Sequence, residues 1–183
     1  MANEKLTALG ALGRPADEDL LYTVDDPTGT AASRKTTAGE MRQREHGVVF
    51  VSAGAASQSL SATTWTKITQ FAADGENNLT TPSHSNDKIT LTVAGSYVVA
   101  FSLSFIGAPG VVYQVGAYVG GSLATACRSS VDVVVGTATS RYNLSATGIL
   151  AATAAQDLEL YVHASAAATF GVIDAQLTAF RVH

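Results

Sequence analysis

The last third of the sequence contains three strand-like segments, YNLSATGIL (residues 142–150), DLELYV (157–162) and FGVIDAQLTAFRV (170–182). Small and polar residues separate them, as in the turns between antiparallel strands. The third segment reaches almost to the end of the chain, so we expect this strand to be held within a sheet rather than to trail free. Together these segments predict a β-sandwich.

The same alternation continues upstream. Residues 89–93 alternate between apolar residues and threonine, which is the period of a half-buried strand. The next alternating run places one set of large apolar side chains on a single face: Tyr97, Val99, Phe101, Leu103 and Phe105. Gly120 and Gly121 lie between two alternating runs and predict a two-residue hairpin turn, because such turns need positive φ angles.

Shorter strands are expected at residues 48–52, 60–71 and 131–135, and the polar run 74–78 is expected to be a loop. No segment after residue 46 keeps a period of 3.6 residues. The pattern therefore predicts an all-β antiparallel sandwich rather than an α/β fold.

Composition narrows the class of protein further. Only 14% of the residues are charged, against about 25% in an average globular protein. The net charge of −4 argues against nucleic-acid binding. The single cysteine, Cys127, permits no internal disulfide and is expected to be a buried apolar residue. The most apolar stretch, 97–121, is broken by serines and Pro109, so we expect neither a membrane-spanning helix nor, at the N-terminus, a signal peptide.

The charged residues are concentrated near the N-terminus. Residues 1–46 hold more than half of the 11 basic and 15 acidic residues in about a quarter of the length. We therefore predict two parts, an N-terminal arm at 1–46 and a sandwich domain at 47–183. Within the arm, residues 19–27 and 34–37 predict a two-stranded ribbon, which is marginally stable alone and should be ordered when docked on a partner.

The arm offers apolar and basic side chains for such docking. Acidic residues flank the basic ones, which favours the carboxylates of a protein partner over phosphates. The candidate partner-binding residues are Leu21, Tyr22, Val24, Arg34, Lys35, Arg42 and Arg44.

The order of motifs after the arm resembles the C1q/TNF-like jelly roll. The motifs are WTKI (65–68), ITLTVAGSYVV (89–99), LSATGIL (144–150), QDLELYV (156–162) and LTAFRV (177–182). Two departures stand out: Gln156 replaces the glycine that commonly precedes Asp157, and Tyr97 stands alone where the family often has an aromatic pair. The resemblance covers roughly residues 47–183 and implies a homotrimer.

The arm itself resembles the virion-attachment starts of tailed-phage structural proteins. The matching segments are residues 6–9, 15–16, 19–26, Gly29 and 34–37. An arm of this kind before a C1q/TNF-like head implies a phage capsid decoration protein bound to the major capsid protein. It would be made in the host cytoplasm and located on the capsid surface of the virion.

A trimer also has a physical rationale, because self-association would hide a charge-poor sheet face. Tyr161 is opposite the apolar residues of its strand and should point away from the core. Tyr113, Tyr142 and Phe180 are further candidates for the trimer interface.

Two other functions remain open. The loops at 74–87 and 105–113 could bind a host glycan or protein, as in a short tail or head fibre, although the first loop lacks Trp and Tyr. An enzyme is not expected, because the sequence has no nucleophile elbow and few acidic residues after residue 87. The four histidines are dispersed, and a solvated loop explains Asp74, Glu76 and Asp87 better than a calcium site, so we expect no metal or cofactor.

Overall fold

The computed structural model describes residues 20–24, 33–37, 44–133 and 140–182, and the chain divides into two compact units, Met1–Gln43 and Arg44–His183. In the first unit, β1 (Leu20–Val24) pairs with β2 (Ser33–Thr37) in an antiparallel ribbon. This confirms the ribbon predicted from the sequence.

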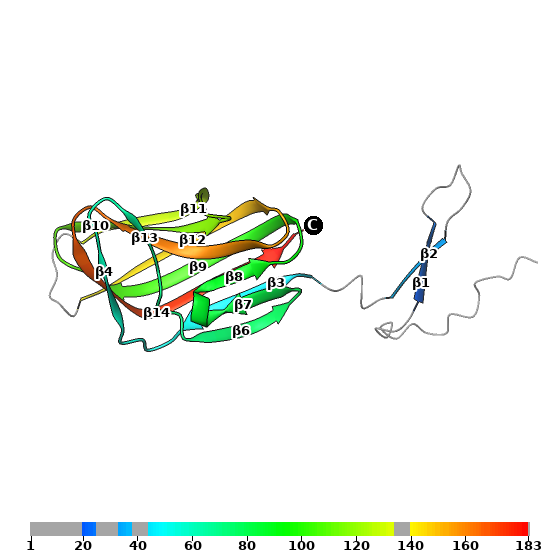
Figure 1. Cartoon of the computed structure of the whole chain (residues 1–183), viewed down its shortest axis with the longest axis horizontal. Helices are drawn as coiled ribbons and strands as arrows, with labels where there is room; N and C mark the ends of the chain where they lie inside the picture. Colours follow the sequence, from blue (N-terminus) through cyan, green and yellow to red (C-terminus); the bar gives the residue numbers. More distant parts are fainter. Residues whose placement is uncertain (1–19, 25–32, 38–43, 134–139, 183) are drawn as a thin grey trace, which may run out of the picture. The chain divides into compact units, whose positions relative to one another are not determined.

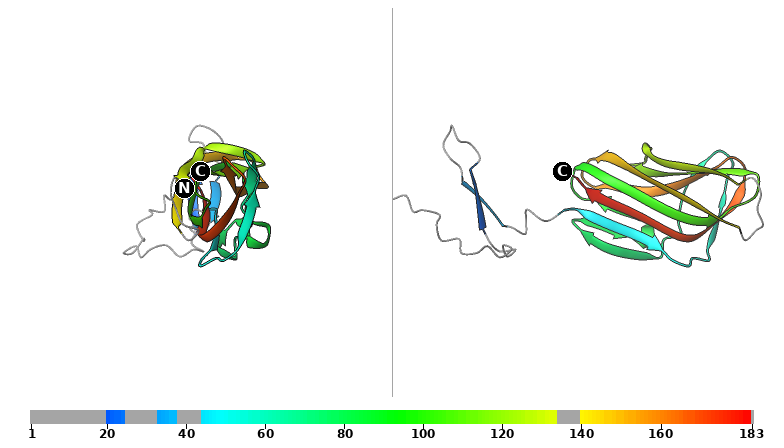
Figure 2. Two further views of the ribbon diagram at one scale, coloured as in Figure 1. Left: turned by 90° about the vertical axis from the view of Figure 1, so that its left-hand side faces the viewer. Right: turned by 180° about the vertical axis from the view of Figure 1, so that it is seen from behind.

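The second unit is a sandwich of two antiparallel sheets (Figures 1 and 2). The β9 sheet has the strand order β12 (Arg141–Ala152), β9 (Gly95–Ile106), β14 (Ala168–Arg181), β3 (His46–Val51) and β6 (Ala73–Asn78), with β4 (Ser57–Leu60) also on β14. The β13 sheet has the order β11 (Ser122–Val133), β10 (Val111–Val119), β13 (Gln156–Ala164), β8 (Lys88–Leu91) and β7 (Thr80–Ser83), with β5 (Trp65–Lys67) also on β13. A single 3₁₀ turn, η1 (His84–Asn86), joins β7 to β8.

Side-chain alternation along the strands produces the core, as the sequence predicts. In β9, every second residue from Tyr97 to Phe105 is buried between the sheets, and the residues that alternate with them point outward. Gly120 and Gly121 form the β10–β11 hairpin with φ of 56° and 79°, so the predicted turn is confirmed.

The densest part of the core is aromatic. The ring of Phe105 lies 5.2 Å from that of Tyr113 and 4.8 Å from that of Phe170, measured between centroids. Cys127 is fully buried, as expected, and its thiol donates a hydrogen bond across the sandwich to the Val99 carbonyl (3.6 Å). Burial raises the pKa of the Cys127 thiol to about 11.

The structure corrects three details of the predicted elements. Residues 74–78 belong to β6, which pairs with β3, so the loop prediction is wrong. β6 is the last strand in the order of its sheet, so one of its edges has no partner strand there, and polar residues suit such an edge. Within the predicted strand 60–71, only Leu60, the last residue of β4, and residues 65–67 of β5 belong to strands. β11 continues unbroken through the two strands expected near 122–126 and 131–135.

The boundary between the units also differs, because the sandwich begins before residue 47. Glu45 accepts a hydrogen bond from the Arg181 guanidinium (3.0 Å), and the Glu45 carbonyl accepts one from the Arg181 backbone N–H. His46 pairs with Phe180 as the first residue of β3. Residues 44–46, including the docking candidate Arg44, therefore belong to the sandwich.

Candidate functional site: an uncharged sheet face

The outward side of the β9 sheet is poor in charge, and we call it the uncharged face after its majority of uncharged residues (the sheet is seen from outside in Figure 2, right). On β9, β12 and β14 its charged side chains are Arg141 and Asp174, and Asp174 accepts a hydrogen bond from the Ala53 backbone N–H (3.0 Å). The other side chains of this face alternate with core residues on β9, β12 and β14 and are either polar without charge or apolar. They are Ser96, Val98, Ala100, Ser102, Ser104, Ile106, Asn143, Ser145, Thr147, Ile149, Ala151, Gln176, Thr178 and Phe180.

An apolar row crosses this face near the end where the domain's chain enters and leaves. Ile149 of β12 pairs with Val98 of β9, which pairs with Phe180 of β14. Ile149 is 66% exposed and Phe180 40%. Large apolar side chains this exposed and this close together, with no charge among them, are unusual for a surface that stays in water.

Charged groups lie only at the margin of the row. The Arg44 guanidinium lies over the ring of Phe180, 6.0 Å from its centroid, and the Arg181–Glu45 ion pair has an N–O distance of 3.0 Å. The imidazole of His46 stacks on the same ring, with 6.4 Å between centroids. The exposed ring of Phe180 thus has two side chains of the domain beside it.

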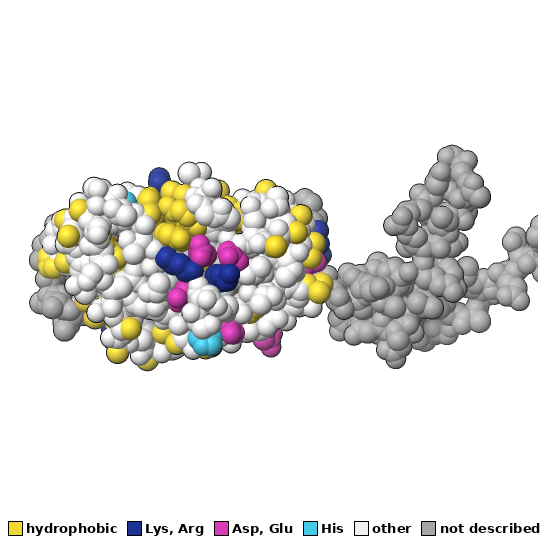
Figure 3. Space-filling view, in the orientation of Figure 1, with side chains coloured by type: hydrophobic (Ala, Val, Ile, Leu, Met, Phe, Trp, Pro, Cys, Tyr) yellow, Lys and Arg dark blue, Asp and Glu magenta, His cyan; other side chains and the backbone are white. Residues whose placement is uncertain are grey.

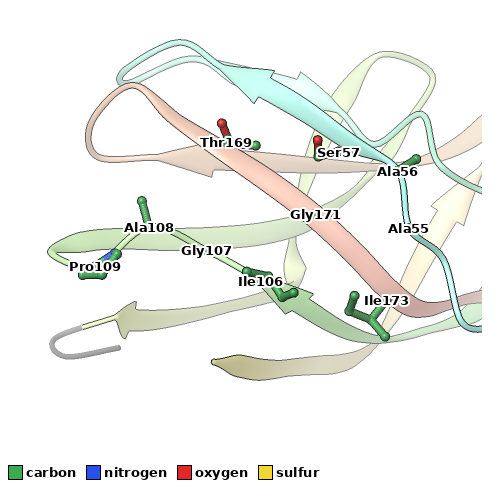
Figure 4. A pocket seen from close by; sticks show the side chains of 10 residues that line it. All are labelled: Ala55, Ala56, Ser57, Ile106, Gly107, Ala108, Pro109, Thr169, Gly171 and Ile173. Carbon is green, nitrogen blue, oxygen red and sulfur yellow. The ribbon is translucent and has the colours of Figure 1, made fainter. Parts of the chain in front are cut away.

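At the other end of the face, an apolar hollow of about 460 Å³ continues the surface (Figure 4). Ile106 and Ile173 lie side by side on one side of it, with Pro109 and the segment 55–57 around the rest. None of its lining residues is charged. The hollow therefore extends the uncharged face instead of forming a polar, catalytic type of site.

The outward side of the β13 sheet, which we call the charged face, has the opposite character. Lys67 and Glu159 form an ion pair with 2.6 Å between nitrogen and oxygen, and Lys88 and Asp157 form another at 2.8 Å. Asp157 also accepts a hydrogen bond from Thr90 (2.7 Å). The β13 sheet thus turns two ion pairs to the solvent, whereas β9, β12 and β14 of the other sheet turn only Arg141 and Asp174 outward as charged residues.

The four aromatic residues predicted at a trimer interface lie in three different places. Tyr113 is fully buried, and its hydroxyl accepts a hydrogen bond from the Ala108 backbone N–H (2.8 Å), so its assignment to an interface is wrong. Its strand turns this side chain into the core, where Phe105 and Phe170 surround it. Tyr142 also points inward and packs partly buried against the core, which removes it from the outer face.

Phe180 and Tyr161 both point outward, but from opposite sheets. Phe180 belongs to the uncharged face, whereas Tyr161 of β13 is half-buried on the charged face. One contact surface on the β9 sheet therefore includes Phe180 and leaves Tyr161 in solvent. The sequence analysis missed Ile149. It alternates with its neighbours Gly148 and Leu150 along the strand, which indicates that its side chain points to the other face.

For the arm, the structure gives the backbone of Leu21, Tyr22, Val24, Arg34 and Lys35 in the β1–β2 ribbon, while Arg42 lies outside the described residues. Their predicted contacts with a partner stay predictions.

The polar segment 74–87 uses two of its acidic groups, Asp74 and Asp87, in contacts within the domain. Asp74 accepts a hydrogen bond from the His84 backbone N–H and lies 3.1 Å from the imidazole of His84. Asp87 accepts a hydrogen bond from the Phe71 backbone N–H (3.0 Å), and burial raises its pKa. Within the part of the chain that the structure describes, no three His, Cys, Asp or Glu side chains gather in a way that could hold a metal ion.

Comparisons with known proteins place this geometry in a fold class. No family model matches the chain, and no curated protein matches it. Among solved structures 86 chains match, including the structure of Eiger TNF from S. frugiperda, with a TM-score of 0.54 and 9% identity over 78% of this chain and 94% of that one.

The domain is thus a TNF-like jelly-roll sandwich, and the fold part of the predicted resemblance is confirmed. Among the described residues there is no helix with the length and apolar character needed to cross a membrane.

Proposed function

We propose that this protein is a homotrimeric structural protein whose TNF-like head associates through the uncharged face. The observation that carries the proposal is the exposed apolar row of Ile149, Val98 and Phe180 on a face poor in charge, opposite a second sheet whose outer face carries paired charges. Burying this apolar row removes apolar area from water, and none of its three side chains is an ion that would have to be desolvated.

Three-fold symmetry suits this surface. A closed cyclic assembly keeps each residue at one height along its axis, so the Ile149–Val98–Phe180 row of one copy meets the same level of the next. A typical interface buries about 800 Å² on each partner, which one face of a sandwich of this size can supply. The likeness to a TNF supports three copies rather than two.

We further propose that residues 1–43 attach the trimer to the capsid of a phage as a decoration protein. This unit is compact by itself and contains the β1–β2 ribbon, in which Tyr22 pairs with Lys35 and Thr23 with Arg34. A trimer presents three such arms, and three weak contacts at high local concentration bind far more tightly than one. Such attachment would clamp neighbouring coat proteins together.

The test compares the full chain with a variant that lacks residues 1–43. Light scattering should give the mass of three copies for both, because the proposed interface lies in the sandwich. Only the full chain should bind shells assembled from the coat protein in a sedimentation assay. A monomer at micromolar concentration would refute the trimer, and undiminished shell binding by the truncated variant would refute attachment through the arm.

A further inference from the structure

Four partly exposed rings gather on the charged face, and we call them the aromatic platform: Trp65, Tyr118, Tyr161 and His163. Tyr118 and Tyr161 are stacked with 4.0 Å between ring centroids. The indole of Trp65 lies 5.9 Å from the ring of Tyr118 and 5.4 Å from that of His163. Three strands, β5, β10 and β13, thus bring their aromatic side chains to one place.

A glycine forms the floor of the platform. Gly116 of β10 pairs with Tyr161 of β13, which in turn pairs with Lys67 of β5. A Cβ atom added at Gly116 would lie 3.6 Å from the Trp65 indole and 2.6 Å from the side chain of Leu123. The Trp65 indole therefore extends from β5 across β13 to β10. Because Gly116 has no side chain, the indole and the side chain of Leu123 can pack against the sheet at this position.

The sandwich does not need these rings for its core. On β13 the inward residues Leu158, Leu160 and Val162 are fully buried and already fill the interior. The platform lies on the other side of the same strand. Figure 3 shows hydrophobic side chains gathered over this sheet directly beside a group of basic and acidic ones.

The polar border of the platform is ordered by its own contacts. The Lys67 ammonium donates to the Glu159 carboxylate and to the Asn86 carbonyl, both at 2.6 Å. The Tyr161 hydroxyl donates to the other oxygen of Glu159 (3.3 Å). The ring of Tyr161 thus lies next to the hydrogen-bonding groups of Lys67 and Glu159. Through the Asn86 carbonyl, the 74–87 segment, which has no Phe, Trp or Tyr, also contacts this border.

The charges around the platform balance. Three basic and three acidic side chains point outward from this face: Lys67, Lys88, Arg128, Asp132, Asp157 and Glu159. A face with paired charges and no net charge attracts neither a strongly acidic nor a strongly basic partner. It suits a ligand that is uncharged, has an apolar flat side and carries many hydroxyl groups.

We propose that the aromatic platform binds a neutral glycan. One pyranose would lie with its C–H groups, which carry partial positive charge, against the electron-rich face of Trp65 or Tyr161. Its hydroxyl groups would bind the Glu159 carboxylate and the Lys67 ammonium. This site goes beyond the structural role proposed above. Since it is on the opposite sheet from the uncharged face, a trimer would display three copies of it outward.

The chain supplies its own probe, because Trp65 is the only tryptophan. The full-length protein is first applied to an array of defined neutral, sialylated and uronate-containing oligosaccharides, with proline-rich decapeptides printed beside them. The best neutral oligosaccharide is then titrated free in solution while tryptophan emission is recorded. We expect saturable binding with a change in emission. Free oligosaccharide is monovalent, so the result is independent of oligomeric state.

Two variants and one control test the residues. Tyr161→Leu keeps apolar bulk on the sheet but removes the ring, and Glu159→Gln keeps the size and removes the charge. Each should weaken binding at least about tenfold, while Phe50→Ala, a partly exposed aromatic residue on the β9 sheet, should bind as the parent does. Circular dichroism establishes that each variant is folded.

Four outcomes would overturn the assignment: no glycan bound at millimolar concentration, binding confined to acidic glycans, capture of the proline-rich peptides alone, or unchanged affinity in folded Tyr161→Leu and Glu159→Gln.

Discussion

The two outer faces of this sandwich are built on strands of the same kind and differ in almost every outward residue. On the β9 sheet, Ser145, Thr147 and Ile149 follow one another outward along β12 without a charge. On the β13 sheet, Asp157 and Glu159 occupy successive outward positions, and each is paired with a lysine. The interior cannot account for this difference, because both sheets bury aliphatic and aromatic residues toward each other.

The difference in charge indicates which face is exposed to solvent and which is covered by a partner. Paired charges at the solvent keep a sheet soluble at little energetic cost, because exposed ion pairs contribute little to stability. A face that is to be covered avoids ions, since each buried charge must be desolvated. We infer that the β9 sheet is the covered side and the β13 sheet the displayed side. The predictions below test this contrast.

The largest effect should come from placing a charge on the uncharged face. Ile149→Asp replaces the most exposed large apolar residue with a carboxylate that an interface would have to bury unpaired. We expect this variant to be a monomer at micromolar concentration, the parent to be a trimer under the same conditions, and the circular dichroism of the two to be the same. Light scattering and native mass spectrometry measure this directly.

The matched control places the same charge on the other sheet. Ser130→Asp is on the exposed edge strand β11, and its side chain points outward on the charged face beside Gln114. This variant should stay a trimer. Dissociation by Ser130→Asp but not by Ile149→Asp would reverse the assignment of the two faces.

A second, smaller effect should come from Cys127, which is buried in the core between the two sheets. Burial raises the pKa of the Cys127 thiol from 9.0 to about 11, so above pH 9 the unfolded chain loses this proton while the folded one keeps it. Stability should therefore fall as pH rises from 9 to about 11, by roughly 2 to 3 kcal/mol. Urea unfolding at a series of pH values measures the slope.

Cys127→Ala supplies the comparison. Burial also raises the pKa of Tyr97 and Tyr113, so the parent and the variant share an alkaline loss of stability from these groups. Only the parent should show the additional fall that begins near pH 9. Equal slopes in the two proteins, or rapid reaction of the native thiol with a disulfide reagent at pH 8, would show that the interior near Cys127 is open to water.

The sequence was a good guide to the interior because burial imposes a period on each strand. The alternation of Tyr97 to Phe105 and the Gly120–Gly121 turn predicted a strand and a hairpin that the structure contains. β6 was missed because an edge strand needs no apolar pattern. Tyr113 was misplaced because an isolated tyrosine in a sequence does not show which way its strand faces.

The surface features were harder to predict, because they depend on how strands pair. The aromatic platform joins residues separated by about 100 positions, Trp65 and His163, through the pairing of β5 with β13. Neither the pairing nor the place of Gly116 beneath them can be read from one sequence. The uncharged face was partly foreseen from the small residues of β9, but its apolar row needs the register of β9 with β12 and β14.

The smallest effect should come from the Lys88–Asp157 pair on the charged face. Burial of Asp157 acts to raise its pKa, but hydrogen bonds from Lys88 and Thr90 outweigh it and hold the pKa below the ordinary value of 3.8. The resulting stability is present above that value and is lost as pH falls from 3.8 through the lower folded value. Both side chains are about one-third exposed, so the contribution should be well below about 1 kcal/mol and should decrease with added salt.

Lys88→Met tests both the contribution of this pair to acid stability and its place outside the trimer interface. It should flatten the acid end of the stability profile measured by urea unfolding between pH 2 and pH 5, and it should leave the trimer intact, because a displayed face does not hold subunits together. Dissociation of this variant, or a loss of several kcal/mol at neutral pH, would mean that the pair is buried in the assembly. The β13 sheet would then be a covered face as well, and the contrast between the two sheets would fail.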